Sequence, residues 1–282
     1  MNEIAEAFIA SCRDEIEAPK PGNVHIFAAG HGMAAEHFLR SAEVAAAPLC
    51  ESAASVGERI LSAVEATWAS VGMNTNLGII LLCAPLAAAA DLGGDLRAAL
   101  KAVLAGLTRD DAQLAFRAIL RASPAGLGNA GRHDVHDAAE TTLLEAMREA
   151  AGRDRIAYQY AADFSDIFET GTAALKKARQ NGWPAPWPAV SVYLGLLASI
   201  PDSHIARKNG LEAAAAVQAE ALTARNKFMT QSNPADSLDD LLDFDRRLKA
   251  AGLNPGATAD LTVATLFANR LTGALIQRPN NG

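Results

Sequence analysis

The chain has 282 residues, of which 50% are hydrophobic and only 5% aromatic, and its formal net charge is -7. Alanine and leucine dominate and β-branched runs are short, a composition that favours an all-α protein with a large core. The negative charge and the lack of a basic stripe argue against a nucleic-acid binder. A small anionic ligand held by a few arginine and lysine side chains is still compatible with this balance.

The cysteine content and the hydropathy narrow the possible classes of protein further. Cys12, Cys50 and Cys83 are odd in number and show no CxxC spacing, which argues against a disulfide framework or a cysteine-based zinc site and favours reduced cytosolic thiols. The acidic N-terminus lacks the basic region of a signal peptide, so we expect a cytoplasmic protein. The apolar run at residues 79–90 is shorter than the roughly twenty residues that cross a bilayer, so we expect a buried helix and no membrane association.

Hydrophobic periodicity predicts a helix in most parts of the chain. The predicted helices cover residues 2–17, 41–47, 51–70, 79–90, 96–106, 110–120, 141–150, 158–168, 190–200, 211–228, 236–250 and 261–275. No heptad pattern or internal repeat persists. The sequence therefore predicts one globular multi-helix bundle over residues 1–282, with buried central helices.

Three local features carry more specific predictions. Thr108 and Asp110 are expected to cap the helix at 110–120. Tyr160, Phe164 and Phe168 recur at helical spacing and are expected in the core. The Pro- and Trp-rich segment 183–188 is expected to be an exposed aromatic loop, which could be a hydrophobic plug, an interface of a possible homodimer, or a wall that stacks on adenine.

Three polar, glycine-bearing blocks adjoin apolar helices, at residues 72–78, 202–210 and 254–260, and we interpret them as parts of one site. Residues 18–25 break the first helix with two prolines and display Lys20 and Asn23, although an ordinary connector has the same composition. Asn74, Thr75 and Asn76 stand before the buried run at 79–90, where free backbone N–H groups favour an anion, or where the amides simply cap the helix. Residues 202–210 and 254–260 are the other two blocks.

A fifth polar segment at residues 133–137 (HDVHD) places two imidazoles and two carboxylates close together. The spacing lacks the catalytic glutamate of an HExxH zinc site. Three interpretations stay open here: a transition-metal site, a Mg²⁺ or substrate contact, and the solvated start of a helix.

The ordered set of blocks resembles the triphosphoribosyl-dephospho-CoA synthase family over residues 15–270. The blocks that carry the resemblance are residues 19–24 (PKPGNV), 74–78 (NTNLG), 202–210 (DSHIARKNG) and 253–261 (LNPGATADL). The resemblance implies an all-α fold and an enzyme that transfers the triphosphoribosyl group of ATP to the ribose 2′-hydroxyl of 3′-dephospho-CoA, with release of adenine. The family usually has Asn-Thr-His-Lys-Gly where this chain has residues 74–78, so a related acceptor stays open.

Breaking the N-glycosidic bond passes through an oxocarbenium-like state, and the polar blocks supply candidates for each task. The phosphate and nucleotide contacts are assigned to Lys20, Asn23, Asn74, Thr75, Asn76, Arg207, Lys208 and Asn254. The carboxylates assigned to a Mg²⁺ that accompanies ATP are Asp202, Asp260 and Asp134. The catalytic candidates are His204, Asp202, His133 and His136, with an imidazole as general base.

Structural roles compete with these assignments. Asp202 could form a salt bridge with Arg207, and Asp260 could simply complement a helix dipole. Two other functions also remain: another ATP-using enzyme, such as a kinase or a phosphoribosyl-type transferase, and a non-catalytic protein that binds a nucleotide-like cofactor. Free adenine rather than ADP as the co-product separates the first function from a kinase.

Overall fold

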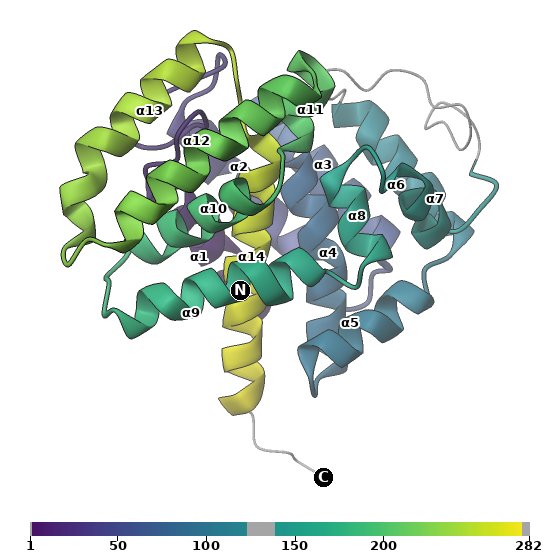
Figure 1. Cartoon of the computed structure of the whole chain (residues 1–282). Helices are drawn as coiled ribbons and strands as arrows, with labels where there is room; N and C mark the ends of the chain where they lie inside the picture. Colours follow the sequence, from purple (N-terminus) through teal and green to yellow (C-terminus); the bar gives the residue numbers. More distant parts are fainter. Residues whose placement is uncertain (1, 123–138, 278–282) are drawn as a thin grey trace. The chain divides into compact units, whose positions relative to one another are not determined.

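The computed structural model describes residues 2–122 and 139–277, and within them all regular structure is helical apart from two isolated β-bridges in residues 25–33 (Figure 1). The all-α fold class predicted from composition is therefore confirmed. The chain divides into two compact units, each built from separate stretches of sequence.

Unit 1 takes the described residues of Met1–Ala10, Arg40–Phe164 and Phe267–Gly282. The helices that lie wholly within it are α3 (Val56–Val71), α4 (Leu77–Leu92), α5 (Leu96–Ala105), α6 (Arg109–Ala122), α7 (Leu143–Ala150) and α8 (Arg155–Ala161).

Unit 2 takes Ser11–Leu39 and Ser165–Leu266. Its own helices are the π-helix η1 (Asp166–Gly171), α9 (Thr172–Gln180), α10 (Trp187–Ser199), α11 (Ser203–Asn209), α12 (Leu211–Met229), the 3₁₀-helix η2 (Pro234–Ser237) and α13 (Leu238–Ala250). The remaining helices, α1 (Glu3–Glu17), α2 (Ala35–Leu49) and α14 (Gly256–Gln277), contribute residues to both units.

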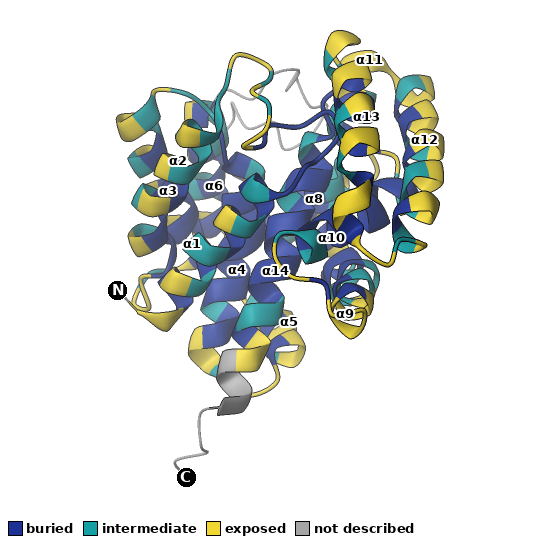
Figure 2. Cartoon of the chain, turned by 90° about the vertical axis from the view of Figure 1, so that its left-hand side faces the viewer, coloured by how far each residue is buried: buried dark blue, intermediate teal, exposed yellow. Residues whose placement is uncertain are grey.

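Helix α4 is buried along most of its length, as its uniformly apolar sequence predicts (Figure 2). It contains Pro85, which has no N–H to donate to the carbonyl of Leu81 one turn earlier. The hydroxyl of Tyr160 donates to that carbonyl instead, at 2.6 Å. A tertiary hydrogen bond thus replaces the missing helical one and lets a buried helix tolerate proline.

The start of α6 packs closely against α3. The backbone N–H of Gly57 donates to Asp111 at 2.7 Å, and a Cβ atom at Gly57 would stand 2.6 Å from the Asp111 Cα. The other carboxylate oxygen of Asp111 accepts from the Thr108 hydroxyl at 2.7 Å. Thr108 caps this helix as predicted, because its hydroxyl accepts the Asp111 N–H at 3.1 Å. The prediction for Asp110 is wrong: the carboxylate that pairs with Thr108 is that of Asp111, which also reaches α3.

Several helix boundaries differ from those predicted. Helix α2 begins at Ala35, several residues before the predicted start. The helix predicted over 158–168 is interrupted, because Asp163 and Phe164 take left-handed conformations with φ of 49° and 56°. Phe164 nevertheless packs in the core against Tyr160, with ring centroids 5.6 Å apart. Helices α9 and α11 were not predicted.

The Pro- and Trp-rich segment folds inward. Trp183 is 6% exposed and its ring lies 4.8 Å from that of Phe228, while the Trp187 ring lies 6.2 Å from the same phenylalanine. The expectation of an exposed Trp183 is wrong, and the packing favours the hydrophobic plug. A homodimer through this segment stays a prediction.

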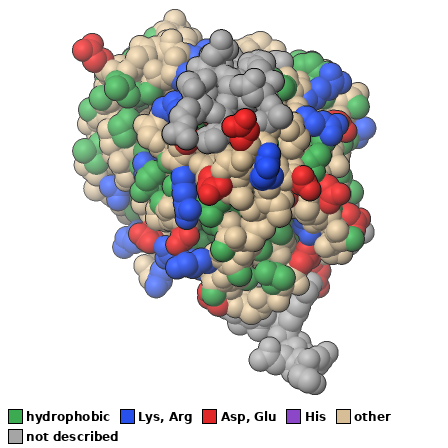
Figure 3. All heavy atoms as spheres, turned by 90° about the vertical axis from the view of Figure 1, so that its right-hand side faces the viewer, with side chains coloured by type: hydrophobic (Ala, Val, Ile, Leu, Met, Phe, Trp, Pro, Cys, Tyr) green, Lys and Arg blue, Asp and Glu red, His purple; other side chains and the backbone are tan. Residues whose placement is uncertain are grey.

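No membrane span stands out in the described part of the chain. Taken singly, none of its helices has the length and apolarity to cross a bilayer; two bent pairs, α4 with α5 (112°) and α10 with α11 (53°), reach that length only together. On the face in Figure 3, the described Lys and Arg side chains lie among Asp and Glu side chains.

Candidate functional site

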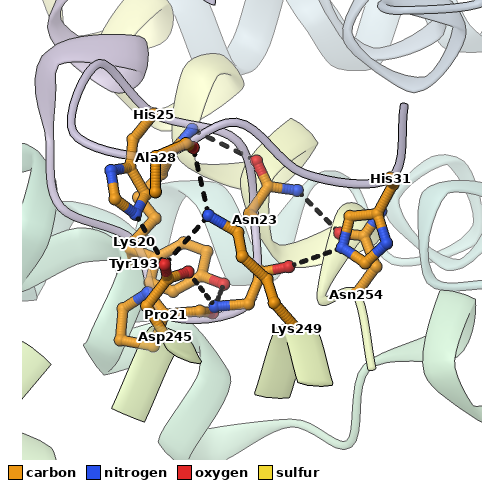
Figure 4. Close-up of polar contacts among 11 residues, drawn as sticks. Lys20, Pro21, Asn23, His25, Ala28, His31, Tyr193, Asp245, Lys249 and Asn254 are labelled. Atoms are coloured by element: carbon orange, nitrogen blue, oxygen red, sulfur yellow. Dashed lines mark hydrogen bonds and ion pairs between the residues drawn. The ribbon is translucent and has the colours of Figure 1, made fainter. Parts of the chain in front are cut away.

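The interior of unit 2 holds many polar side chains, which we call the polar core. All of its members are buried: Glu15, Lys20, Asn23, His25, Asp202, Asp245, Asn254 and Thr258. They come from the end of α1 and the loop after it, from α13, and from the starts of α11 and α14. Figure 4 shows five of them: Lys20, Asn23, His25, Asp245 and Asn254. Charges inside a protein are costly unless they are paired, so the partners of each group decide what it can do.

Lys20 is fully buried, and its ammonium faces the carboxylate of Glu15 on α1. It also donates to the Asn23 side-chain oxygen at 3.3 Å. Burial raises the pKa of Glu15 and lowers the pKa of Lys20, while the attraction between the two acts against both shifts. Lys20 is thus not displayed on the loop, and a phosphate could reach it only by displacing Glu15.

Gly22 fixes the turn that follows Lys20. Its φ is +83°, and a Cβ atom here would stand 2.8 Å from the ring of Pro255, so no other residue fits without a shift. The Gly22 N–H donates to Asp245 at 2.8 Å. The turn places the Asn23 amide so that it donates to the Asn254 side-chain oxygen at 2.8 Å, and two of the polar blocks meet there.

Asp245 projects inward from α13, a helix whose sequence looks solvated. One of its oxygens accepts from Lys249 at 2.9 Å and lies 3.4 Å from His25 Nε2. Lys249 also donates to the backbone carbonyl of Ala28 at 3.1 Å and so ties α13 to the loop. His25 is 1% exposed, and burial lowers its pKa although the carboxylate of Asp245 acts in the opposite direction.

Asp202 joins the second pair of blocks. One carboxylate oxygen accepts the backbone N–H groups of His204 and Ile205, at 2.8 and 3.1 Å, and so caps α11. The other accepts both the N–H and the hydroxyl of Thr258, each at 2.8 Å, at the start of α14. Burial raises the pKa of Asp202, while these four donors favour the carboxylate. The geometry favours a role in holding two helices rather than in metal coordination.

His204 lies against the backbone of α14. Its Nδ1 is 2.8 Å from the position of a Cβ atom at Gly256, so glycine is required there. Its Nε2 is buried and has no hydrogen-bond partner in the described residues. Burial, together with Arg207 and Lys208, lowers the pKa of His204 to about 4. A neutral imidazole with so low a pKa is a weak proton acceptor near neutral pH.

Two exposed cations and one carboxylate surround this core. Arg207 and Lys208 are exposed in the last turn of α11. Asp260 is half-buried on α14, and its charge acts against the lowering of the Lys20 pKa that burial causes. The described residues contain no group of three or more His, Cys, Asp and Glu side chains that could hold a metal ion.

The amide block belongs to unit 1, where each side chain has a partner within that unit. Asn74 accepts the first backbone N–H of α4 at 3.2 Å, which agrees with the capping interpretation. The Thr75 hydroxyl bonds with that of Ser41 at 2.6 Å, and Asn76 donates to Thr67 at 3.1 Å.

Comparison with known proteins shows which family the chain belongs to. A family model described as ATP:dephospho-CoA triphosphoribosyl transferase (CitG) matches residues 1–278. The chain belongs to this family. It is also similar to a crystal structure from Archaeoglobus fulgidus, provisionally assigned as a triphosphoribosyl-dephospho-CoA synthase, with 25% identity and a TM-score of 0.67 over 83% of this chain and 99% of that one. A search of the curated proteins gave no match.

In this member of the triphosphoribosyl transferase family, three of the four motif blocks meet in unit 2. They are joined by the hydrogen bonds between Asn23 and Asn254 and between Asp202 and Thr258. The fourth block lies in unit 1, and His133, Asp134 and His136 lie outside the described residues. Sequence reasoning missed Glu15, whose only signal is an acid on the inner side of the helix that precedes the PKPGNV motif.

Proposed function

We propose that the protein transfers the triphosphoribosyl group of ATP to the ribose 2′-hydroxyl of 3′-dephospho-CoA, or of a closely related acceptor, and releases adenine. The family match over residues 1–278 carries this proposal. The meeting of three motif blocks in one polar core supports it, because the blocks are far apart in sequence and yet form one connected set of buried side chains.

The substrate phosphates carry several negative charges, so cations must neutralise them. We assign this task first to Arg207 and Lys208, because both are exposed and adjoin the polar core. Lys20 stays a proposed phosphate contact that requires Glu15 to give way. Asn23 and Asn254, which are hydrogen-bonded to each other beside Lys20, are proposed to contact the nucleotide through their side-chain amides.

Mg²⁺ is proposed to arrive with the triphosphate, where it would neutralise phosphate charge. Magnesium bound to a nucleotide needs only one or two protein carboxylates, so the absence of a protein cage among the described residues is compatible with it. Asp260 is the half-buried carboxylate that fits this role best. Two sets of assignments rest on the sequence alone. One set gives Asp134 to the metal and His133 and His136 to catalysis. The other gives the nucleotide contacts to Asn74, Thr75 and Asn76.

We also place the reaction in the cytoplasm. Cys12, Cys50 and Cys83 are all buried and none of them forms a disulfide, a pattern that suits a reducing compartment.

The test is to incubate the purified protein with ATP, Mg²⁺ and 3′-dephospho-CoA and to separate the products by chromatography with mass detection. Free adenine together with an adduct of dephospho-CoA and the triphosphoribosyl group is the expected result. ADP in place of adenine would show a kinase, and ATP that raises the melting temperature without turnover would show a binding protein; either result contradicts the proposal.

A pair of charge variants tests the phosphate assignment. Arg207→Gln with Lys208→Gln should raise the KM for ATP at least tenfold, because two cations beside the polar core are lost. The matched control is Lys176→Gln with Lys177→Gln, which removes two adjacent exposed cations from α9 and should change the KM little. If both double variants raise the KM for ATP equally, the effect comes from the loss of overall charge, and the phosphate assignment is contradicted.

A further inference from the structure

His31 is held in a backbone conformation that histidine rarely adopts. Its φ is 54°, and the next residue, Gly32, has a φ of 77°. Gly30 and Met33 close this turn with two backbone hydrogen bonds, of 3.0 and 2.9 Å. Two successive residues with positive φ are typical of a type I′ turn, where asparagine and glycine are the usual choices. Histidine at this position costs stability, and such local strain is often found at functional sites.

The imidazole of His31 is also fixed. Its Nε2 lies 3.0 Å from the backbone carbonyl oxygen of Gly22 (Figure 4). A carbonyl only accepts, so Nε2 must carry the hydrogen. In the neutral ring Nδ1 is then the nitrogen with a free lone pair. Gly22 cannot shift easily, because it packs against Pro255 and donates to Asp245.

The ring stands at the edge of the polar core. It bonds to the turn between Lys20 and Asn23, and a proton on it would lower the pKa of His204, which belongs to another motif block. Among the histidines that the structure describes, His31 is the exposed one. His25 is buried, and the Nε2 atom of His204 is buried too. A substrate hydroxyl could therefore approach His31 without a rearrangement of the core.

We propose that His31 Nδ1 accepts the proton of the attacking 2′-hydroxyl, with the Gly22 carbonyl holding the ring in place. This inference rests on the proposed function and deepens it, since it assigns the general base to His31 instead of His204.

The hydroxyl oxygen forms a bond to C1′ of the triphosphoribosyl group, and the C1′–N9 bond breaks with its electron pair going to adenine. The hydroxyl proton passes to His31 Nδ1 and then to solvent. Adenine takes one proton from solvent, so the reaction leaves no net proton.

Two substitutions separate the imidazole from the turn. His31→Asn tolerates the left-handed conformation, but its amide cannot serve as a base and is too short to replace the bond from Nε2 to Gly22. His31→Gly removes the side chain and relieves the strain. We expect kcat to fall by about 100- to 10,000-fold in both, with little change in KM, while the melting temperature of His31→Gly stays the same or rises.

Added imidazole should restore part of kcat in His31→Gly, because the site is open to solvent. His37→Asn, on nearby α2, is the control and should keep kcat within about threefold of the native value. The proposal is overturned if either His31 variant keeps kcat within that range, or if imidazole restores no activity.

A second measurement does not depend on turnover. Diethyl pyrocarbonate acylates unprotonated imidazole nitrogens, and mass spectrometry maps the products. We expect His31 to react faster than His25 and His204, and dephospho-CoA to protect it. Labelling no faster than that of His25 and His204, or no protection, overturns the assignment even if the native protein releases adenine. Fast labelling with protection, but no adenine, refutes the proposed reaction while supporting an accessible base at the ligand site.

Discussion

Replacing Asp202 with asparagine is expected to destabilise the fold, because the carboxylate faces donors on both sides. One oxygen accepts two backbone N–H groups of α11 and the other accepts the N–H and hydroxyl of Thr258. An amide has one acceptor oxygen and one NH₂ group, so in either orientation its NH₂ meets a backbone N–H. At least one buried donor then has no partner.

The magnitude follows from these bonds. A buried N–H left unpaired costs about 1–3 kcal/mol, and each hydrogen bond to a charged group contributes about 1.5–3 kcal/mol. We expect Asp202→Asn to lower the free energy of unfolding by about 3 kcal/mol. Asp202→Ala also removes the helix cap and should cost about 1 kcal/mol more. For a chain of this size, about 3 kcal/mol corresponds to a fall of roughly 5 °C in Tm.

The assay is thermal and urea unfolding followed by circular dichroism, with adenine release measured on the same samples. Thr258→Val removes only the hydroxyl and serves as the comparison, and combining it with Asp202→Asn should cost less than the sum of the two. A Tm within about 2 °C of native with no adenine release would refute the reasoning and return Asp202 to the metal or catalytic role that the sequence suggested.

Three further predictions test other parts of the structure. Lys20→Met should destabilise by about 3–5 kcal/mol in urea unfolding because it leaves Glu15 buried and unpaired, and adding Glu15→Leu should recover most of the loss; an additive double variant would contradict this. His204 has a folded-state pKa of about 4, below its ordinary 6.5, so the unfolded chain takes up this proton first and stability falls as pH drops through that window. His204→Asn should therefore lose less Tm between pH 7 and pH 5 than the native protein, and an equal loss would rule this out. Gly57→Ala brings a Cβ atom to 2.6 Å from the backbone of Asp111 and should cost about 1–3 kcal/mol, whereas an unchanged Tm would show that α3 and α6 can separate freely.

The sequence predicted helices best where burial alone decides the pattern. Helix α4 is apolar on every side and could hardly be anything else. The short helix α11 was missed because its seven residues are mostly polar and its cap, Asp202, is itself held by Thr258, a partner 56 positions away. The break in the helix at Asp163 and Phe164 could not be predicted either, because these residue types do not by themselves indicate a left-handed conformation.

The site was predictable in part, because its polar blocks stand out beside the apolar sequences of buried helices. Of the three polar blocks that were placed in one site, residues 202–210 and 254–260 meet, and residues 18–25 join them, whereas residues 72–78 belong to the other unit. The inward roles of Glu15 and Asp245 were not visible, because each lies in a helix with other acids and only tertiary packing shows which one turns inside. His31 had one usable signal, the Gly-His-Gly spacing of a tight turn, which sequence analysis did not weigh.

The polar core also restricts how related proteins can diverge. Asn23 donates to Asn254, and Asp202 accepts from Thr258, so the members of each pair are fitted to one another across 231 and 56 positions. A change in one partner alone leaves a buried polar group unsatisfied, whereas a matched change in both can restore the fit. Members of the family should therefore exchange these residues in pairs, and the pairs that are kept will mark which relatives retain the same interior chemistry.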